Sequence, residues 1–178
     1  MSTAGFDEHL IAQIGSGDSE AFRKLYLATS SIVFGYALSI LKNKTDAEDV
    51  MHDAYIRVHQ SAITYQPQGK PLAWMLTIVR NLCYNTIKSS RPTTDVGECE
   101  NLALPDGSQA SLDRIVLERA LELLDSEERQ IVILHALTGM KHREIAELLE
   151  LPTGTVLSKY HRALKQLRNE LAGEEGVR

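Results

Sequence analysis

The hydrophobic pattern in the last third of the chain predicts three successive helices, over about 126–138, 141–149 and 153–172. Apolar residues recur there every three or four positions, which is the spacing of one helix face. Turn and capping residues mark the helix ends: Asp125 or Ser126, Gly139, Pro152 and Thr153. A short helix, a tight turn and a longer helix make a helix-turn-helix, a unit whose second helix lies in the DNA major groove.

The last of these helices has one apolar face and one basic face on a wheel of about 100° per residue. The apolar stripe comprises Val156, Tyr160, Ala163, Leu164, Leu167 and Leu171. The opposite side carries Thr155, Ser158, His161, Arg162 and Lys165, with Lys159 and Arg168 on the flanks. Residues 153–168 include four basic residues and no acidic one, although the whole chain has a net charge of -5. This local basicity indicates a polyanion as the partner; a helical hairpin with a solvated basic face is the alternative.

Helical periodicity also predicts helices in the first half of the chain. One begins at Asp18, and the apolar residues after Ser30 favour its continuation. A second is capped by Thr45, with Glu48 at the spacing of a capping box. Its apolar positions are Val50, Ala54, Ile56 and Val58, and its other face carries Asp46, Asp49, Asp53 and Arg57. Such a charge row is most often a solvated face, but it is also suited to docking a partner.

After a predicted loop between Ser61 and Pro71, a long helix spans about 72–89. Its predicted core stripe is Leu72, Met75, Leu76, Val79, Leu82, Cys83 and Thr86. The opposite face holds Trp74, Thr77, Ile78, Asn81, Tyr84, Asn85 and Lys88. Amides that can read base edges, beside aromatic rings that can stack on unpaired bases, suit single-stranded nucleic acid. The alternative is that Trp74 and Ile78 pack on neighbouring helices.

Composition and charge refine this picture to an all-α protein of two small helical domains. Aromatic residues make up 6% of the 178 residues, and helical periods dominate. The net charge is +1 over residues 1–91, -4 over 92–111 and -2 over 112–178. The middle stretch has turn residues, no sustained periodicity and four acids: Asp95, Glu98, Glu100 and Asp106. We therefore expect an acidic, flexible linker there.

Several classes of protein do not fit the sequence. No apolar run approaches the roughly 20 residues that a membrane span needs, and no secretion signal opens the chain. Cys83 and Cys99 lack metal-ligand spacing and suit a reducing cytosol, with Cys83 in the core and Cys99 in a loop. No nucleophile, acid–base pair, metal cluster or phosphate loop points to an enzyme, a metal site, a cofactor or a small-molecule substrate.

Three motifs in order over about residues 6–172 resemble the bacterial extracytoplasmic-function (ECF) sigma factors, the smallest members of the sigma-70 family. The segment Thr45-Asp-Ala-Glu-Asp-Val-Met-His-Asp-Ala-Tyr-Ile-Arg-Val resembles the helix of region 2.2. Regions 2.3 and 2.4 are similar to Pro71-Leu-Ala-Trp-Met-Leu-Thr-Ile-Val-Arg-Asn-Leu, and region 4 is similar to the chain from Leu124 through Leu171.

The resemblance implies a cytoplasmic, non-enzymatic subunit that makes core RNA polymerase promoter-specific and assists opening of the -10 strands. Docking on the coiled coil of the β′ subunit is implied for Asp46, Glu48, Asp49, Asp53 and Arg57. Capture of flipped-out -10 bases is implied for the loop before Pro71 and the helix after it, through Tyr65, Trp74, Asn81, Tyr84, Asn85 and Lys88. Reading of the -35 duplex is implied for Thr153, Thr155, Ser158, Lys159, His161, Arg162 and Lys165.

The same resemblance implies the domain roles and further partners. Residues 1–91 correspond to region 2 and residues 112–178 to region 4, while the linker over 92–111 corresponds to the segment that threads the polymerase toward the RNA exit path. The implied partners are promoter DNA, the β flap of core RNA polymerase and an anti-sigma factor, which is often membrane-anchored. No direct membrane insertion of this chain is expected.

Some positions depart from the usual family pattern. Leu157 stands where a basic residue is common, Glu150 where Gly is often found, and His59 where an aromatic residue is frequent. The basic run after region 2.4 is reduced to Lys88 and Arg91, which predicts weaker duplex contact upstream of the -10 element.

Two other functions remain open at this point. A one-component helix-turn-helix repressor would need a ligand pocket or a dimer helix within residues 1–91, and it would act without polymerase. A non-DNA adaptor of two helical domains would show no salt-dependent binding to DNA.

Overall fold

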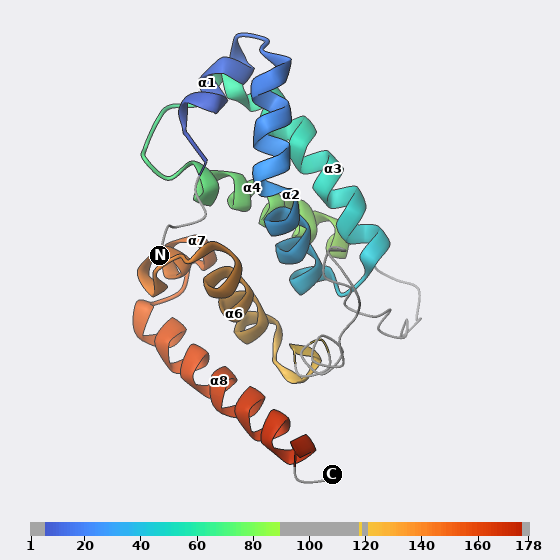
Figure 1. The fold of residues 1–178 in the computed structure, drawn as a ribbon, viewed down its shortest axis with the longest axis vertical. Coiled ribbons are helices and arrows are strands. Elements are labelled where there is room, and N and C mark those ends of the chain that lie inside the picture. Colours follow the sequence, from blue (N-terminus) through green and yellow to red (C-terminus); the bar gives the residue numbers. More distant parts are fainter. Residues whose placement is uncertain (1–5, 90–117, 119–120, 176–178) are drawn as a thin grey trace.

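The computed structural model describes residues 6–89, 118 and 121–175 (Figure 1). The described residues form helices and their connections, with no strand among them, so the predicted all-α class is confirmed. The predicted linker, Arg91, Cys99 and the side chain of Leu171 lie outside the described residues.

The N-terminal half is a bundle of four α-helices (Figure 1). They are α1 (His9–Gly15), α2 (Ser19–Leu41), α3 (Lys44–Ser61) and α4 (Pro71–Ser89), with the 3-10 turn η1 (Ala62–Thr64) after α3. The loop of residues 65–70 leads from η1 into α4. Most of the core stripe predicted for α4 is buried: Leu72, Met75, Leu76, Val79 and Cys83. Leu82 and Thr86 are only half-buried.

The C-terminal half is the predicted helix-turn-helix, with α8 outermost (Figure 1). Its helices are α6 (Ser126–Thr138), α7 (His142–Leu149) and α8 (Thr153–Glu175). Asp125 caps α6 in a capping box with Glu128, and Gly139 ends the helix at a φ of 68°. Both helix-end predictions for α6 are therefore confirmed, because Asp satisfies free N–H groups and Gly adopts the left-handed region at little cost.

α2 is a continuous helix of 23 residues that runs through the core. Asp18 caps it by accepting hydrogen bonds from the backbone N–H groups of Glu20 and Ala21, which confirms the predicted start. By length and composition alone α2 could cross a membrane, since the mean hydropathy over an 18-residue window of this helix is 1.4. This finding contradicts the expectation that no apolar run approaches such a length. Because 61% of that window is buried in the structure, as in any core helix, it is weak evidence for a membrane span.

α3 begins earlier than the sequence predicts, because Asn43 caps it in place of Thr45. The side chain of Asn43 accepts a hydrogen bond from the N–H of Asp46 at 2.9 Å, and Thr45 lies inside the first turn. Asn is as good an N-cap as Thr, so the capping box predicted with Glu48 was wrong. Ile56 is also not a core residue, since it is 54% exposed.

α2 and α6 pack against each other and join the two halves (Figure 1). Gly35 permits close approach, because a Cβ there would lie 2.8 Å from Cδ1 of Leu137. Tyr36 is fully buried, and its hydroxyl donates a hydrogen bond to Oε1 of Gln130 at 3.4 Å. Burial raises the pKa of the Tyr36 phenol, so the hydroxyl keeps its proton at this contact.

Arg129 places a buried charge at the same contact, with 0% of its surface exposed. Its guanidinium donates hydrogen bonds to the carbonyl oxygens of Leu121 at 2.8 Å, Leu124 at 2.6 Å and Ser39 at 3.3 Å. Ser39 belongs to α2, whereas Leu121 and Leu124 precede α6. One side chain therefore joins both halves, and the carbonyl dipoles compensate for the lost hydration of the cation.

We expect Arg129→Met to lower the free energy of unfolding by about 3 kcal/mol. Met fills a similar volume but leaves buried carbonyl groups of both halves without these donors. Urea denaturation of the full chain, followed by circular dichroism, measures the loss. Arg23→Met is the control, because Arg23 makes only an exposed i,i+3 ion pair and should change stability little. An Arg129→Met variant as stable as the wild type would contradict this role.

Candidate nucleic-acid interface

The basic face of α8 is open to solvent. Its exposed residues are Thr153, Ser158, His161, Arg162 and Lys165, while Thr155 and Lys159 are half-buried. The described residues of the apolar stripe lie on the other side: Val156, Ala163 and Leu167 are buried, and Tyr160 and Leu164 are half-buried. The two-faced helix predicted from the sequence is confirmed.

Acidic residues at the start of α6 contact two of the basic side chains on α8. Nζ of Lys159 lies 3.2 Å from carboxylate oxygens of both Asp125 and Glu127. Burial opposes the charge of Lys159, but hydrogen bonds to Glu127 and Asp125 outweigh it and raise its pKa. Nε of Arg162 pairs with Glu128, whose side chain is 4% exposed. These pairs fasten α8 to α6.

The ion pair of Arg162 orients the side chain without covering it. The Arg162 side chain remains 59% exposed, and Glu128 contacts only its Nε. The two terminal nitrogens are therefore available for a base edge or a phosphate. Leu157, directly before Ser158, is 38% exposed and adds an apolar group of the kind that contacts a thymine methyl.

The turn between α7 and α8 is tied to the N-terminal half through Glu150. This residue has a φ of 58°, a left-handed conformation that strains a non-Gly residue by about 1 kcal/mol. Arg80 of α4 donates hydrogen bonds to Oε1 of Glu150 at 3.2 Å and to the carbonyl of Leu149 at 3.3 Å. The Arg80 side chain is only 17% exposed, which strengthens the pair. The contact offsets part of the strain that Gly would avoid.

Three histidines and a tyrosine form a cluster that joins α6, α7 and α8. The rings of His135 and His142 stack with centroids 5.0 Å apart, and Tyr160 meets them at 5.0 and 4.6 Å. Among the described atoms, Nε2 of His142 is buried and has no hydrogen-bond partner. Burial first, then the positive charges of His135 and His161, lower the pKa of His142. The cluster therefore packs best with a neutral His142.

We expect mild acid to destabilise the helix-turn-helix through His142. Its pKa in the folded chain lies below the ordinary value of 6.5, so the unfolded chain takes up the proton first. Stability is therefore full above about pH 6.5 and falls as the pH decreases below it. His142→Phe keeps a flat ring beside Tyr160 and removes the proton site. Urea unfolding between about pH 5 and 7.5 should show a smaller loss for the variant; parallel losses would contradict this origin.

The face of α4 combines exposed polar groups with half-buried rings. Asn81, Asn85 and Lys88 are exposed, and Trp74, Ile78 and Tyr84 are half-buried. Trp74 and Ile78 pack against the core with part of their surface, as the alternative interpretation expects, and the rest of each side chain stays exposed. Trp74 also meets Tyr65 with ring centroids 4.6 Å apart, and Arg80 lies over the ring of Tyr84 at 5.1 Å.

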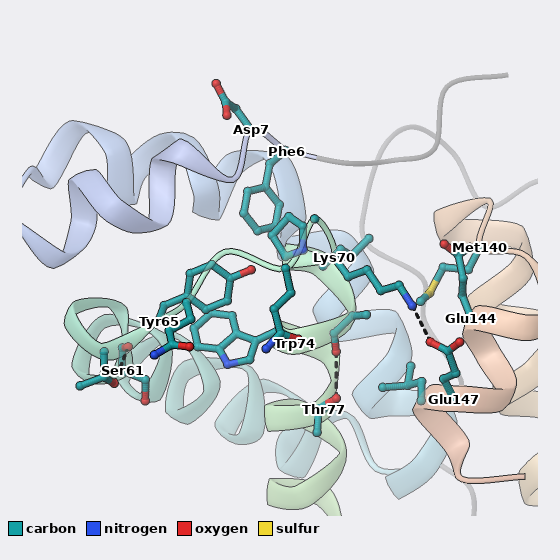
Figure 2. Close-up of a pocket in the computed structure, with 18 residues that line it drawn as sticks. Phe6, Asp7, Ser61, Tyr65, Lys70, Trp74, Thr77, Met140, Glu144 and Glu147 are labelled. Atoms are coloured by element: carbon teal, nitrogen blue, oxygen red, sulfur yellow. Dashed lines mark hydrogen bonds and ion pairs between the residues drawn. The ribbon is translucent and has the colours of Figure 1, made fainter.

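A groove of about 1140 Å³ lies between the loop of residues 65–70 and α7 (Figure 2). Its wall from the N-terminal half includes Tyr65, Gln66, Gln68, Trp74 and Thr77, and its wall from the C-terminal half includes Met140, Glu144 and Glu147. Lys70 reaches across to Glu147, with Nζ 2.5 Å from the carboxylate, and this hydrogen bond lowers the pKa of Glu147. Amides beside aromatic rings can hold a flat polar ring such as a nucleobase.

The charged face of α3 is open to a partner. Glu48, Asp49, Asp53 and Arg57 are exposed and Asp46 is half-buried. Within the described part of the chain, none of these five side chains takes part in an ion pair. Ile56 shares this face with Asp49 and Asp53 and borders an apolar pocket of about 420 Å³. The face therefore combines unpaired charge with exposed apolar surface.

Sequence analysis missed the residues that act over long separations. They are Glu8, Lys70, Arg80, Arg129 and Glu147, and each contacts a partner that is distant in the chain. Only Arg129 leaves a local signal, since it stands on the same helix face as the apolar residues Val132 and Ile133, three and four positions later. No group of three or more His, Cys, Asp or Glu in the described ranges is placed to hold a metal ion.

Two family models match the chain. Residues 25–93 match Sigma-70 region 2, and residues 114–167 match Sigma-70, region 4. The first match covers most of α2 together with α3 and α4, and the second covers α6, α7 and most of α8. α1 lies outside both matches.

Relatives and solved structures agree with these matches. The ECF RNA polymerase sigma factor SigL of Mycobacterium tuberculosis is 27% identical over 164 residues, covering 89% of this chain and 93% of SigL. RNA polymerase sigma factor CarQ of Myxococcus xanthus is 29% identical over 163 residues, covering 89% of this chain and 92% of CarQ. The sigma factor RpoE of Bartonella quintana, in complex with the anti-sigma factor NepR, is similar with a TM-score of 0.73 at 24% identity, covering 85% of this chain and 96% of RpoE. CnrH, in complex with the cytosolic domain of CnrY, gives a TM-score of 0.68 at 24% identity, covering 94% of this chain and 97% of CnrH.

Proposed function

Because this chain belongs to the ECF sigma factors of the sigma-70 family, we propose that it binds core RNA polymerase and directs it to promoters through their -35 and -10 elements. One observation supports this most strongly. The chain carries two separate surfaces suited to nucleic acid, the basic face of α8 and the groove beside α4. The first suits a duplex and the second suits unpaired bases. A repressor that reads duplex DNA has no use for the second.

The -35 element is read by α8 in the major groove. Ser158, His161 and Arg162 contact base edges from the exposed face, and Arg162 is already oriented by Glu128. Phosphates are contacted by Thr153 and Thr155 in the first turn of α8 and by Lys165 farther along the same helix. Lys159 contributes by holding α8 on α6 through its two carboxylate partners.

The -10 element is bound as an unpaired strand by the loop of residues 65–70 and α4. Tyr65 and Trp74 supply a ring surface beside the groove amides, on which a flipped base stacks. The surface continues along α4 through Asn81, Tyr84, Asn85 and Lys88. Binding of the unstacked strand stabilises the open promoter, so strand opening needs no nucleotide hydrolysis by this chain.

Core polymerase docks on α3. The charged contact with the coiled coil of the β′ subunit is formed by Asp46, Glu48, Asp49, Asp53 and Arg57, and region 4 contacts the β flap.

Residues 1–91 act as region 2 and residues 112–178 as region 4, joined by the acidic linker over 92–111. Since RpoE is found with an anti-sigma factor, we extend such control to this chain in the cytoplasm.

Arg162→Ala tests the -35 interface. If the guanidinium contacts a base, affinity of the holoenzyme for promoter DNA should fall about tenfold and selectivity at one -35 position should relax. A phosphate contact would instead reduce the salt dependence by about one unit of slope with a smaller loss. Filter binding at several salt concentrations distinguishes these results. Unchanged affinity and salt slope would remove Arg162 from the interface.

Asp49→Ala tests the docking face of α3. Its side chain is exposed and has no ion-pair partner in the described residues, so the fold should keep its stability. Affinity for core polymerase should fall about tenfold, because a charge pair across the interface is lost. Glu20→Ala removes an equal charge from α2 and should bind as the wild type does. An Asp49→Ala variant that retains wild-type affinity in a titration with core polymerase would contradict the docking proposal.

A further inference from the structure

Glu8 holds the loop of residues 65–70 from the start of the chain. Its Oε1 accepts hydrogen bonds from the hydroxyl of Tyr65 at 2.5 Å and from the backbone N–H groups of Gln68 at 2.9 Å and Gly69 at 3.1 Å. Oε2 lies 3.2 Å from the N–H of Gly69. The partners are 57 to 61 residues away in sequence. One carboxylate can accept all these bonds because it has two oxygens and no donor.

The carboxylate is fixed in space because α1 is packed against the bundle. Ile11 and Ile14 of α1 are 0% and 2% exposed. Gly15 brings α1 close to η1, since a Cβ at that position would lie 3.0 Å from the carbonyl of Ala62. η1 directly precedes the loop, so the segment that α1 contacts is also the segment from which the loop starts. Because Glu8 stands at the start of this packed helix, its hydrogen bonds hold the loop against the core.

The loop has few other means of holding its conformation. Residues 66–69 have no helix or strand hydrogen bonding, and Gly69 has a φ of 71°. Burial, together with the hydrogen bond to Glu8, raises the pKa of Tyr65 to about 12, so its hydroxyl remains a donor at neutral pH. The hydrogen bond from Tyr65 lowers the pKa of Glu8, so the acceptor remains charged. The same contact holds the Tyr65 ring beside Trp74.

We propose that Glu8 is a positioning residue that sets the loop of residues 65–70 in the conformation that selects an unpaired -10 base. This inference rests on the function proposed above for that loop. Glu8 acts through Tyr65, Gln68 and Gly69 rather than by touching the base. Without it, the loop can adopt other conformations, some of which accommodate other bases, so the difference in affinity between correct and wrong bases becomes smaller. Glu8 precedes residue 25, where the match to Sigma-70 region 2 begins.

Trp74 allows the first test without DNA or polymerase, because it is the only tryptophan in the chain. We would compare Glu8→Ala, Glu8→Gln and the control Glu20→Ala, which removes an exposed carboxylate from α2. Glu8→Ala should raise the acrylamide quenching constant of Trp74 about twofold, because the loop opens locally. Glu8→Gln should raise the constant less than Glu8→Ala does, since its amide oxygen can still accept from Tyr65 and Gln68, whereas its NH2 group cannot accept from the Gly69 N–H as Oε2 does. Thermal unfolding of each variant separates a local change from a general loss of stability.

Base selection is the second test, measured with core polymerase on fork-junction DNA. Each of the four bases is placed in turn at each unpaired -10 position, and affinity is compared. Glu8→Ala should reduce the preference for the best base about tenfold while affinity for core polymerase is unchanged. Glu8→Gln should keep more of the preference than Glu8→Ala does, and Glu20→Ala should keep all of it.

Several results would overturn the inference. Unchanged quenching in Glu8→Ala would show that the loop does not depend on Glu8. Increased quenching with unchanged base preference would show that loop order does not set selection. Equal losses in Glu8→Gln and Glu8→Ala, or in Glu20→Ala, would assign the effect to negative charge. A wild-type protein that prefers no base would instead contradict the function proposed for the loop.

Discussion

The buried guanidinium of Arg129 is the interaction on which the arrangement of the two halves depends. It donates hydrogen bonds to carbonyl oxygens on both sides, those of Ser39 in α2 and of Leu121 and Leu124 before α6. A desolvated cation is tolerated only where such acceptors are already in place, so each half completes the environment that the other needs. Gly35 and Tyr36 bring α2 close enough for this contact to form. The position of the helix-turn-helix on the bundle follows from it.

A second constraint is that several basic groups near the candidate nucleic-acid surfaces are paired with acids of the same chain. Lys70 pairs with Glu147, and Lys159 pairs with Asp125 and Glu127. A phosphate that binds such a group replaces a carboxylate instead of finding a free cation, so the gain in free energy is smaller. This pairing agrees with a net charge of -5 in a protein whose reading helix is basic. Under the proposed function, nucleic-acid binding then depends on the affinity that core polymerase adds.

The sequence was most informative where local signals agree. The ends of α6 and the two faces of α8 were predicted because caps, turns and periodicity all indicate the same helices. The start of α3 was missed because Asn43 and Thr45 can both cap a helix, and the stronger capping residue, Asn43, was passed over. The hydropathy of α2 was underestimated because Ser and Thr interrupt its apolar residues, although packing buries most of them. The contact of Glu8 with the loop leaves no local pattern in a single sequence, since its partners are 57 or more residues away.

Run-off transcription with purified core RNA polymerase that lacks any sigma factor tests the central claim most directly. The template is a pool of genomic fragments from the organism that encodes the chain. The account predicts discrete transcripts that appear only when this protein is added, with shared sequences upstream of their start sites at the -35 and -10 positions. Core polymerase that binds neither the protein nor any promoter in its presence would contradict the account and favour a repressor or an adaptor.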